Sequence, residues 1–170
     1  MSKINENVGI ASIIDCGEYD NIHPTDKETP GTRLAQRVLS DTYEQGGLKN
    51  LTLAKAIFDG DKCVLEFDGT YGELAYKKTD GILLTAKVNE IVSFDDAKAN
   101  SDEVYGFEIS SNGGLFYKPQ VIADGDRLIL KGNENEEITE VRYGWFSYGV
   151  ANIYSKELMP LMPFKVNSKG

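Results

Sequence analysis

The chain has 170 residues, enough for one domain or for one domain and a piece of another, and its 41% hydrophobic content indicates a folded globular protein. Its 18 basic and 27 acidic residues give a net charge of −9, which repels the phosphates of nucleic acids and anionic lipids. No apolar run approaches the roughly 20 residues that span a bilayer. We therefore expect no nucleic-acid partner and no membrane partner, and the cellular compartment stays open because an export signal could lie upstream.

Residues 8–16, VGIASIIDC, form an almost unbroken apolar run that is rich in β-branched residues. Such a run predicts a strand that is covered on both faces in a parallel sheet. Nothing downstream reads as the further strand–helix units that would supply its parallel neighbours. The strand would then expose apolar surface and unpaired edges, which favours packing on the rest of the chain or pairing with a second copy in a homodimer.

A polar loop, EYDNIHPTD at residues 18–26, separates this run from a predicted helix. Asp26 or Thr29 can cap the helix, and Pro30 fits its first turn, where the N–H groups have no partner within the helix. Gly46 and Gly47 are expected to end it. One helical face is apolar and carries Leu34, Ala35, Val38 and Leu39, and the opposite, polar face carries Arg33, Gln36, Arg37 and Asp41. Strand, loop and helix make one unit of an α/β fold, in which the loop after the strand holds the chemistry.

From residue 48 onward, short β-type runs alternate with turn sequences. Asp-Gly at residues 59–60 and 124–125 lies between apolar runs, which predicts hairpins because glycine supplies the positive φ of a tight turn. Alternation predicts inward faces that carry Cys63, Leu65 and Phe67 in one strand and Val141, Tyr143 and Trp145 in another. Residues 82–100 are ambiguous beyond a strand at their start.

The predicted fold class is therefore mainly β, with a C-terminal antiparallel β-sandwich preceded by a strand–loop–helix remnant of an α/β domain. The boundary is placed after Gly46, so that residues 1–46 form the α/β part and residues 47–170 the sandwich. The two cysteines, Cys16 and Cys63, lie in apolar surroundings, which favours buried thiols over a disulfide or a metal site.

The chain's one histidine, His23, lies three residues after Asp20 and directly before Pro24. A serine hydrolase needs an imidazole to take the proton of the nucleophile and a carboxylate to orient that imidazole. An Asp-x-x-His loop that folds back on itself can supply both, and Pro24 restricts His23 to extended conformations that help such a turn. The spacing alone favours a loop histidine that is hydrogen-bonded to Asp20 or Asp26 over a catalytic pair.

Metal and cofactor sites find little support in the sequence. Oxygen and nitrogen ligands could come from Asp15, Glu18, Asp20, His23 and Asp26. A single histidine, however, cannot build a multi-histidine catalytic zinc site, and acidic loop residues are usually solvated. The Asp-Gly-Asp turns lack the further ligands of a calcium loop. We expect neither a cofactor nor a metal.

Residues 8–39 resemble the final catalytic segment of the sialate O-acetylesterases, which belong to the SGNH (GDSL-like) hydrolases. In that family a strand leads to a D-x-x-H-P loop and then to a helix with a G-x-R-L-A pattern, matched here by residues 20–24 and 31–35. The family's closing β domain has a V-R-Y-x-W strand and a tail like N-x-Y-x-K-E-x-x-P-x-x-P-F. Residues 141–145 and 152–164 match these two motifs.

The resemblance implies that His23 is the general base of a catalytic triad and that Asp20 is the acid that orients it. The substrate implied is an O-acetylated sugar, in particular O-acetylated sialic acid. The family's nucleophilic serine lies upstream of the matched segment, and none of the ten serines here stands in a Gly-Asp-Ser or Gly-x-Ser-x-Gly motif. We therefore expect the partner of this chain to be a missing hydrolase segment, and the chain alone to be inactive.

A non-catalytic alternative treats the β region as a carbohydrate-binding or packing module. Aromatic rings can stack on sugars, although sandwich cores bury aromatic residues routinely. The candidate platforms are Tyr71, Tyr76, Tyr105, Tyr117, Trp145, Tyr148 and Tyr154.

Overall fold

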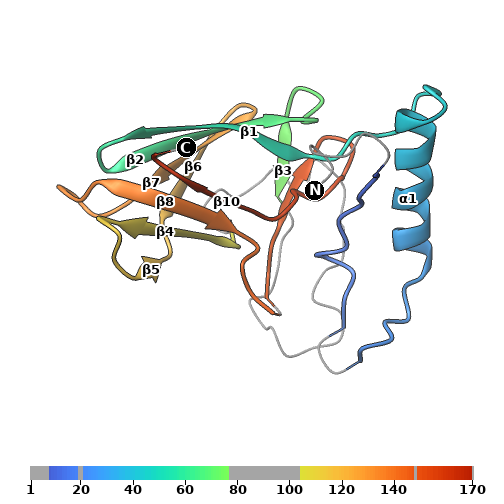
Figure 1. The fold of residues 1–170 in the computed structure, drawn as a ribbon, viewed down its shortest axis with the longest axis horizontal. Helices are drawn as coiled ribbons and strands as arrows, with labels where there is room; N and C mark the ends of the chain where they lie inside the picture. Colours follow the sequence, from blue (N-terminus) through green and yellow to red (C-terminus); the bar gives the residue numbers. More distant parts are fainter. Residues whose placement is uncertain (1–7, 19–20, 77–103, 148, 170) are drawn as a thin grey trace.

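The computed structural model describes residues 8–18, 21–76, 104–147 and 149–169, and in this part of the chain a helix stands beside a β body (Figure 1). The helix is α1 (Glu28–Asp41). The strands are β1 (Thr52–Asp59), β2 (Lys62–Asp68), β3 (Leu74–Tyr76), β4 (Phe107–Ser111), β5 (Phe116–Tyr117), β6 (Gln120–Asp124), β7 (Arg127–Lys131), β8 (Ile138–Tyr143), β9 (Ile153–Ser155) and β10 (Phe164–Asn167). All pairings between these strands are antiparallel, so the predicted mainly β fold class is confirmed.

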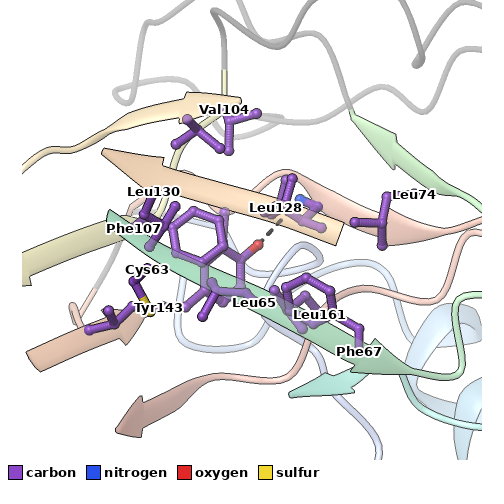
Figure 2. Packing of buried hydrophobic residues seen from close by; sticks show 14 of the residues in the cluster. Cys63, Leu65, Phe67, Leu74, Val104, Phe107, Leu128, Leu130, Tyr143 and Leu161 are labelled. Atoms are coloured by element: carbon purple, nitrogen blue, oxygen red, sulfur yellow. Dashed lines mark hydrogen bonds between the residues drawn. The ribbon is translucent and has the colours of Figure 1, made fainter. Parts of the chain in front are cut away.

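Two four-stranded sheets form most of the β body, with strand orders β1-β2-β7-β6 and β10-β8-β4-β5. Their inner faces share one core, in which Leu65 and Leu128 of the first sheet join Phe107 and Tyr143 of the second (Figures 1 and 2). Alternate residues of β2 are buried, as its period of two predicts. The hydroxyl of Tyr143 accepts a hydrogen bond from the backbone N–H of Ile153 at 3.2 Å, which links this core to β9.

The small sheet of β3 and β9 lies at the end of the β body nearer to α1 (Figure 1). Tyr154 in the middle of β9 pairs with Ala75 of β3 and is 1% exposed. The side chain of Tyr154 therefore has a fixed position, because its strand is paired and its ring is buried.

Both predicted hairpins form, since Asp59 pairs with Lys62 and Asp124 pairs with Arg127 across the turns. The inward faces are also as predicted, with the exception of Trp145, which is 53% exposed. β8 ends at Tyr143, and Gly144 takes a φ of +64°, a conformation that leaves the extended chain. The alternation of β8 therefore stops before Trp145, and the prediction of an inward ring was wrong.

Residues 8–13 carry no regular secondary structure, so the predicted strand at residues 8–16 was wrong. A parallel strand forms only beside another strand, and the described residues offer it no parallel neighbour. The segment instead packs on the β body, where the carbonyl of Ile10 accepts a hydrogen bond from Asn50 Nδ2 at 2.7 Å. Ile14 also packs against the main core.

The helix begins close to the predicted place. The N-cap residue is Lys27, and the preceding Asp26 accepts a hydrogen bond from the N–H of Thr29 at 2.9 Å. The helix ends at Asp41, five residues before Gly46. In the described part of the chain, no helix is long and apolar enough to cross a membrane.

Some sequence predictions fall on residues that lie outside the described ones. These are the strand expected at the start of residues 82–100, the ring of Tyr148 and the carboxylate of Asp20.

Candidate functional site

The loop that carries His23 is closed by the carboxylate of Glu18. One oxygen of Glu18 accepts hydrogen bonds from the N–H of Thr25 at 2.8 Å and from its hydroxyl at 2.6 Å. The other accepts from the amide nitrogen of Asn21 at 2.7 Å. Asn21 Oδ1 in turn accepts the N–H of His23 at 3.0 Å. His23 therefore sits on a stretch whose two ends are tied to one carboxylate, as a loop that folds back requires.

These hydrogen bonds favour the ionised form of Glu18. The hydroxyl of Thr25 is the largest cause, followed by the N–H of Thr25 and the amide of Asn21, and together they lower the pKa of Glu18 below its usual value. The carboxylate is thus charged at neutral pH, and both of its oxygens are occupied. In the described part of the chain no three acidic, cysteine or histidine side chains gather around a possible metal position.

The imidazole of His23 is exposed and makes no hydrogen bond to another described residue. Two grooves flank the neighbouring segments, one of about 430 Å³ against residues 11–14 and one of about 550 Å³ beside Arg33. His23 lines neither of them. An active site at His23 would therefore need walls from groups beyond those that the structure describes.

A second set of contacts ties the base of the loop together. Arg33 of α1 holds Asp15 in a two-pronged ion pair, with Nη1–Oδ1 at 2.6 Å and Nη2–Oδ2 at 2.8 Å. Arg33 Nη1 also donates to the carbonyl of Ser12 at 2.9 Å. The side chains of Arg33 and Asp15 are 8% and 3% exposed. The pair therefore joins the segment before the loop to the helix after it, in a dry environment.

Tyr154 of β9 completes this set, since its hydroxyl donates to Asp15 Oδ2 at 3.1 Å across 139 positions of sequence. We call Asp15, Arg33 and Tyr154 the base clamp. Burial alone would lower the pKa of Arg33, but the hydrogen bond and charge of Asp15 outweigh it and raise the pKa. Burial, followed by the charge of Asp15, raises the pKa of Tyr154 well above its usual value, so this hydroxyl keeps its proton and can donate.

The base clamp was not foreseen from the sequence. Arg33 appears there only on the polar face of the helix and in the G-x-R-L-A pattern, and Asp15 only in the apolar run before the loop and as a possible metal ligand. A buried arginine needs a carboxylate partner. An arginine and an aspartate at the two ends of one loop are therefore a sequence pattern that could predict an ion pair across the base of that loop. No local sequence pattern predicts the contact with Tyr154.

Apolar side chains around the loop are left uncovered. On α1, Leu34 and Val38 are 51% and 48% exposed, whereas the polar Arg33 is the buried residue of the helix. The apolar face that the sequence predicts thus points away from the β body. The other exposed apolar side chains in this region are Val8, Ile13, Ile22, Leu39 and Tyr43. Leu34 and Val38 lie one turn apart on α1, and exposed apolar side chains gathered on one face are typical of interaction sites.

No protein-family model matches the chain, and no curated protein matches it significantly. Among solved structures the chain is similar to XAC1771, a carbohydrate acetylesterase from Xanthomonas citri, with 29% sequence identity and a TM-score of 0.72. The match covers 93% of this chain and 32% of XAC1771, so the chain spans about a third of the length of that protein. The similarity supports a relation to carbohydrate esterases.

Proposed function

We propose that this chain is the acid–base part of a carbohydrate O-acetylesterase. The observation that carries the proposal is the similarity to the carbohydrate acetylesterase XAC1771 over nearly the whole chain. The Asp-x-x-His-Pro loop supports it, because residues 20–24 carry an acid and a base in a segment whose ends are tied to Glu18. Residues 1–46 would then be the end of an SGNH-type hydrolase domain, and residues 47–170 its β-sandwich neighbour.

In this proposal His23 takes the proton of the serine hydroxyl as its oxygen attacks the acetyl carbonyl, and gives that proton to the sugar oxygen as the ester bond breaks. Water then attacks the acetyl-serine and gives a proton to His23, which passes it to the serine oxygen as the acetyl–serine bond breaks and acetate leaves. Asp20 accepts a hydrogen bond from the imidazole and stabilises its charged form. We propose an O-acetylated sugar, and O-acetylated sialic acid in particular, as substrate, on the basis of the motifs shared with the sialate O-acetylesterases.

The nucleophile in this proposal comes from a further hydrolase segment, because the serines of the chain lack the motif contexts of a nucleophile. The exposed apolar side chains of α1, with Leu34 and Val38 at the centre, would be covered by that segment. The coverage of XAC1771 supports this, since about two thirds of that protein have no counterpart in the chain. A second copy of the chain is the alternative occupant, and size-exclusion chromatography with light scattering separates monomer from dimer.

The sugar-binding alternative has weaker support. Tyr76 and Tyr154 are buried, which removes them as stacking platforms. Trp145 and Tyr71 are exposed and keep this alternative open for the β region. Loss of sugar binding on Trp145→Ala in the purified chain would favour it.

The first test is acetate release from O-acetylated sialic acid by the purified chain, with His23→Ala as the comparison. We expect no release above the buffer rate, because a base without a nucleophile and an oxyanion hole has nothing to activate. Release that depends on His23 would mean that the chain holds its own nucleophile.

A further inference from the structure

The base clamp joins the two ends of the loop to a residue that is distant in the sequence. Asp15 precedes the loop, Arg33 follows it, and Tyr154 belongs to a strand of the β body. The loop between Asp15 and Arg33 is thus pinned to β9 at its base, while the carboxylate of Glu18 closes it further out.

We propose that Asp15, Arg33 and Tyr154 are positioning residues, through which the β-sandwich fixes the place and orientation of the His23 loop. This inference rests on the proposed function, since it assigns the loop its acid–base role. It gives the β region a task that does not require sugar binding.

Geometry supports the assignment. A two-pronged contact between a guanidinium and a carboxylate fixes the plane and the direction of both groups, which a single bond does not. Arg33 Nη1 also donates to Ser12, so the guanidinium is held on three acceptor atoms. The phenol of Tyr154 adds a fourth fixed contact, from a ring that is itself 1% exposed.

The energy of a buried ion pair indicates that the base clamp serves to orient the loop and does not only stabilise the fold. Two buried charges lose their hydration, and well-packed apolar residues of similar volume often stabilise a fold as well as an ion pair does. An apolar contact would hold the loop less exactly. Catalysis by an acid–base group depends on such exactness, because a displacement of about 1 Å can cost about a hundredfold in rate.

The test compares Tyr154→Phe with the unchanged chain by NMR, using residual dipolar couplings of the loop amides at residues 21–23 and 25. Tyr117→Phe is the matched control, because it also removes one hydrogen-bonded hydroxyl from the β body, here the one in contact with Ser111. The ring signals of His23 provide a second measure without overlap, since the chain has one histidine.

In the unchanged chain we expect the loop couplings to fit the same alignment as those of β2 and β7. In Tyr154→Phe they should shrink and depart from that alignment, and the His23 ring signals should shift. Tyr117→Phe should leave both measures unchanged. A role in stability alone would lower the midpoint of unfolding without moving the couplings of the folded protein.

Couplings in Tyr154→Phe that fit the β body as in the unchanged chain would overturn the inference. Should that variant not fold, Arg33→Lys decides in its place, because lysine keeps the charge but loses the two-pronged contact. The two proposals fail separately. Unchanged couplings leave the acid–base role of His23 intact, whereas a completed esterase that remains active after His23→Ala leaves the base clamp intact.

Discussion

Removing either Asp15 or Arg33 from their buried ion pair should destabilise the protein strongly. Removing both should lower the free energy of unfolding by less than the sum of the two single effects. Arg33→Met leaves Asp15 as a carboxylate that is 3% exposed and takes one donor away from the Ser12 carbonyl. Asp15→Asn leaves the guanidinium of Arg33 charged and without its counter-ion. Breaking a buried pair in this way costs about 3–5 kcal/mol, a large share of a typical total stability of about 5–15 kcal/mol.

The double variant has no buried ionised group left at this place. We therefore expect the cost of Arg33→Met with Asp15→Asn to fall short of the sum of the single costs by about 1–3 kcal/mol. The assay is urea unfolding followed by the fluorescence of Trp145. This residue follows Gly144, where a Cβ would come within 2.6 Å of Ile14 Cδ1 in the segment that the ion pair holds, so its signal reports on that segment.

Asp124 and Arg127 provide the control pair, since their side chains are about half exposed at a hairpin turn. The same two substitutions there, Asp124→Asn and Arg127→Met, should each cost less than about 1 kcal/mol. Single costs at Asp15 and Arg33 as small as those of the control pair, or costs that simply add, would refute the reasoning.

Three further predictions concern other groups. Tyr143→Phe should cost about 1–3 kcal/mol in urea unfolding, because it leaves the buried N–H of Ile153 without its acceptor. Cys63 should resist iodoacetamide at pH 8 in the folded protein while Cys16 reacts, as measured by mass spectrometry, because Cys63 is fully buried and burial raises its pKa to about 12. The pKa of Glu18 is lowered in the folded loop. The contribution of Glu18 to the free energy of unfolding is therefore complete at a pH above its usual pKa of 4.5, and it is lost as the pH falls through the lowered pKa. The NMR shift of the Thr25 amide should follow that titration, and a shift that stays flat through acid would contradict the contact with Glu18.

The parts of the fold that the sequence predicts well are those with local causes. The hairpins follow from Asp-Gly between apolar runs, and the inner face of β2 follows from its period of two. The start of α1 follows from Asp26, whose carboxylate accepts a hydrogen bond from the N–H of Thr29. The prediction for Trp145 was wrong because it continued the alternation of β8 past Gly144, which directly follows the strand.

The parts that it predicts poorly depend on distant partners. A β-branched run at residues 8–16 suits a parallel strand, but strands form in pairs, and the described residues provide no such neighbour. Arg33 was placed on the polar face of the helix, where an exposed side chain is the ordinary expectation. Its burial depends on Asp15 and on Tyr154, which is 139 positions from Asp15, and no local pattern indicates that contact.

The most direct test of the acid–base role is acetate release by a complete esterase in which this chain replaces the matched third of XAC1771. Three versions are compared on O-acetylated sialic acid: the unchanged chain, His23→Ala, and Leu115→Ala as a control at an exposed residue between β4 and β5. We predict that His23→Ala lowers turnover by about 10²–10⁴-fold and that Leu115→Ala leaves it unchanged. Equal turnover in all three versions would contradict the assignment of His23 as the catalytic base.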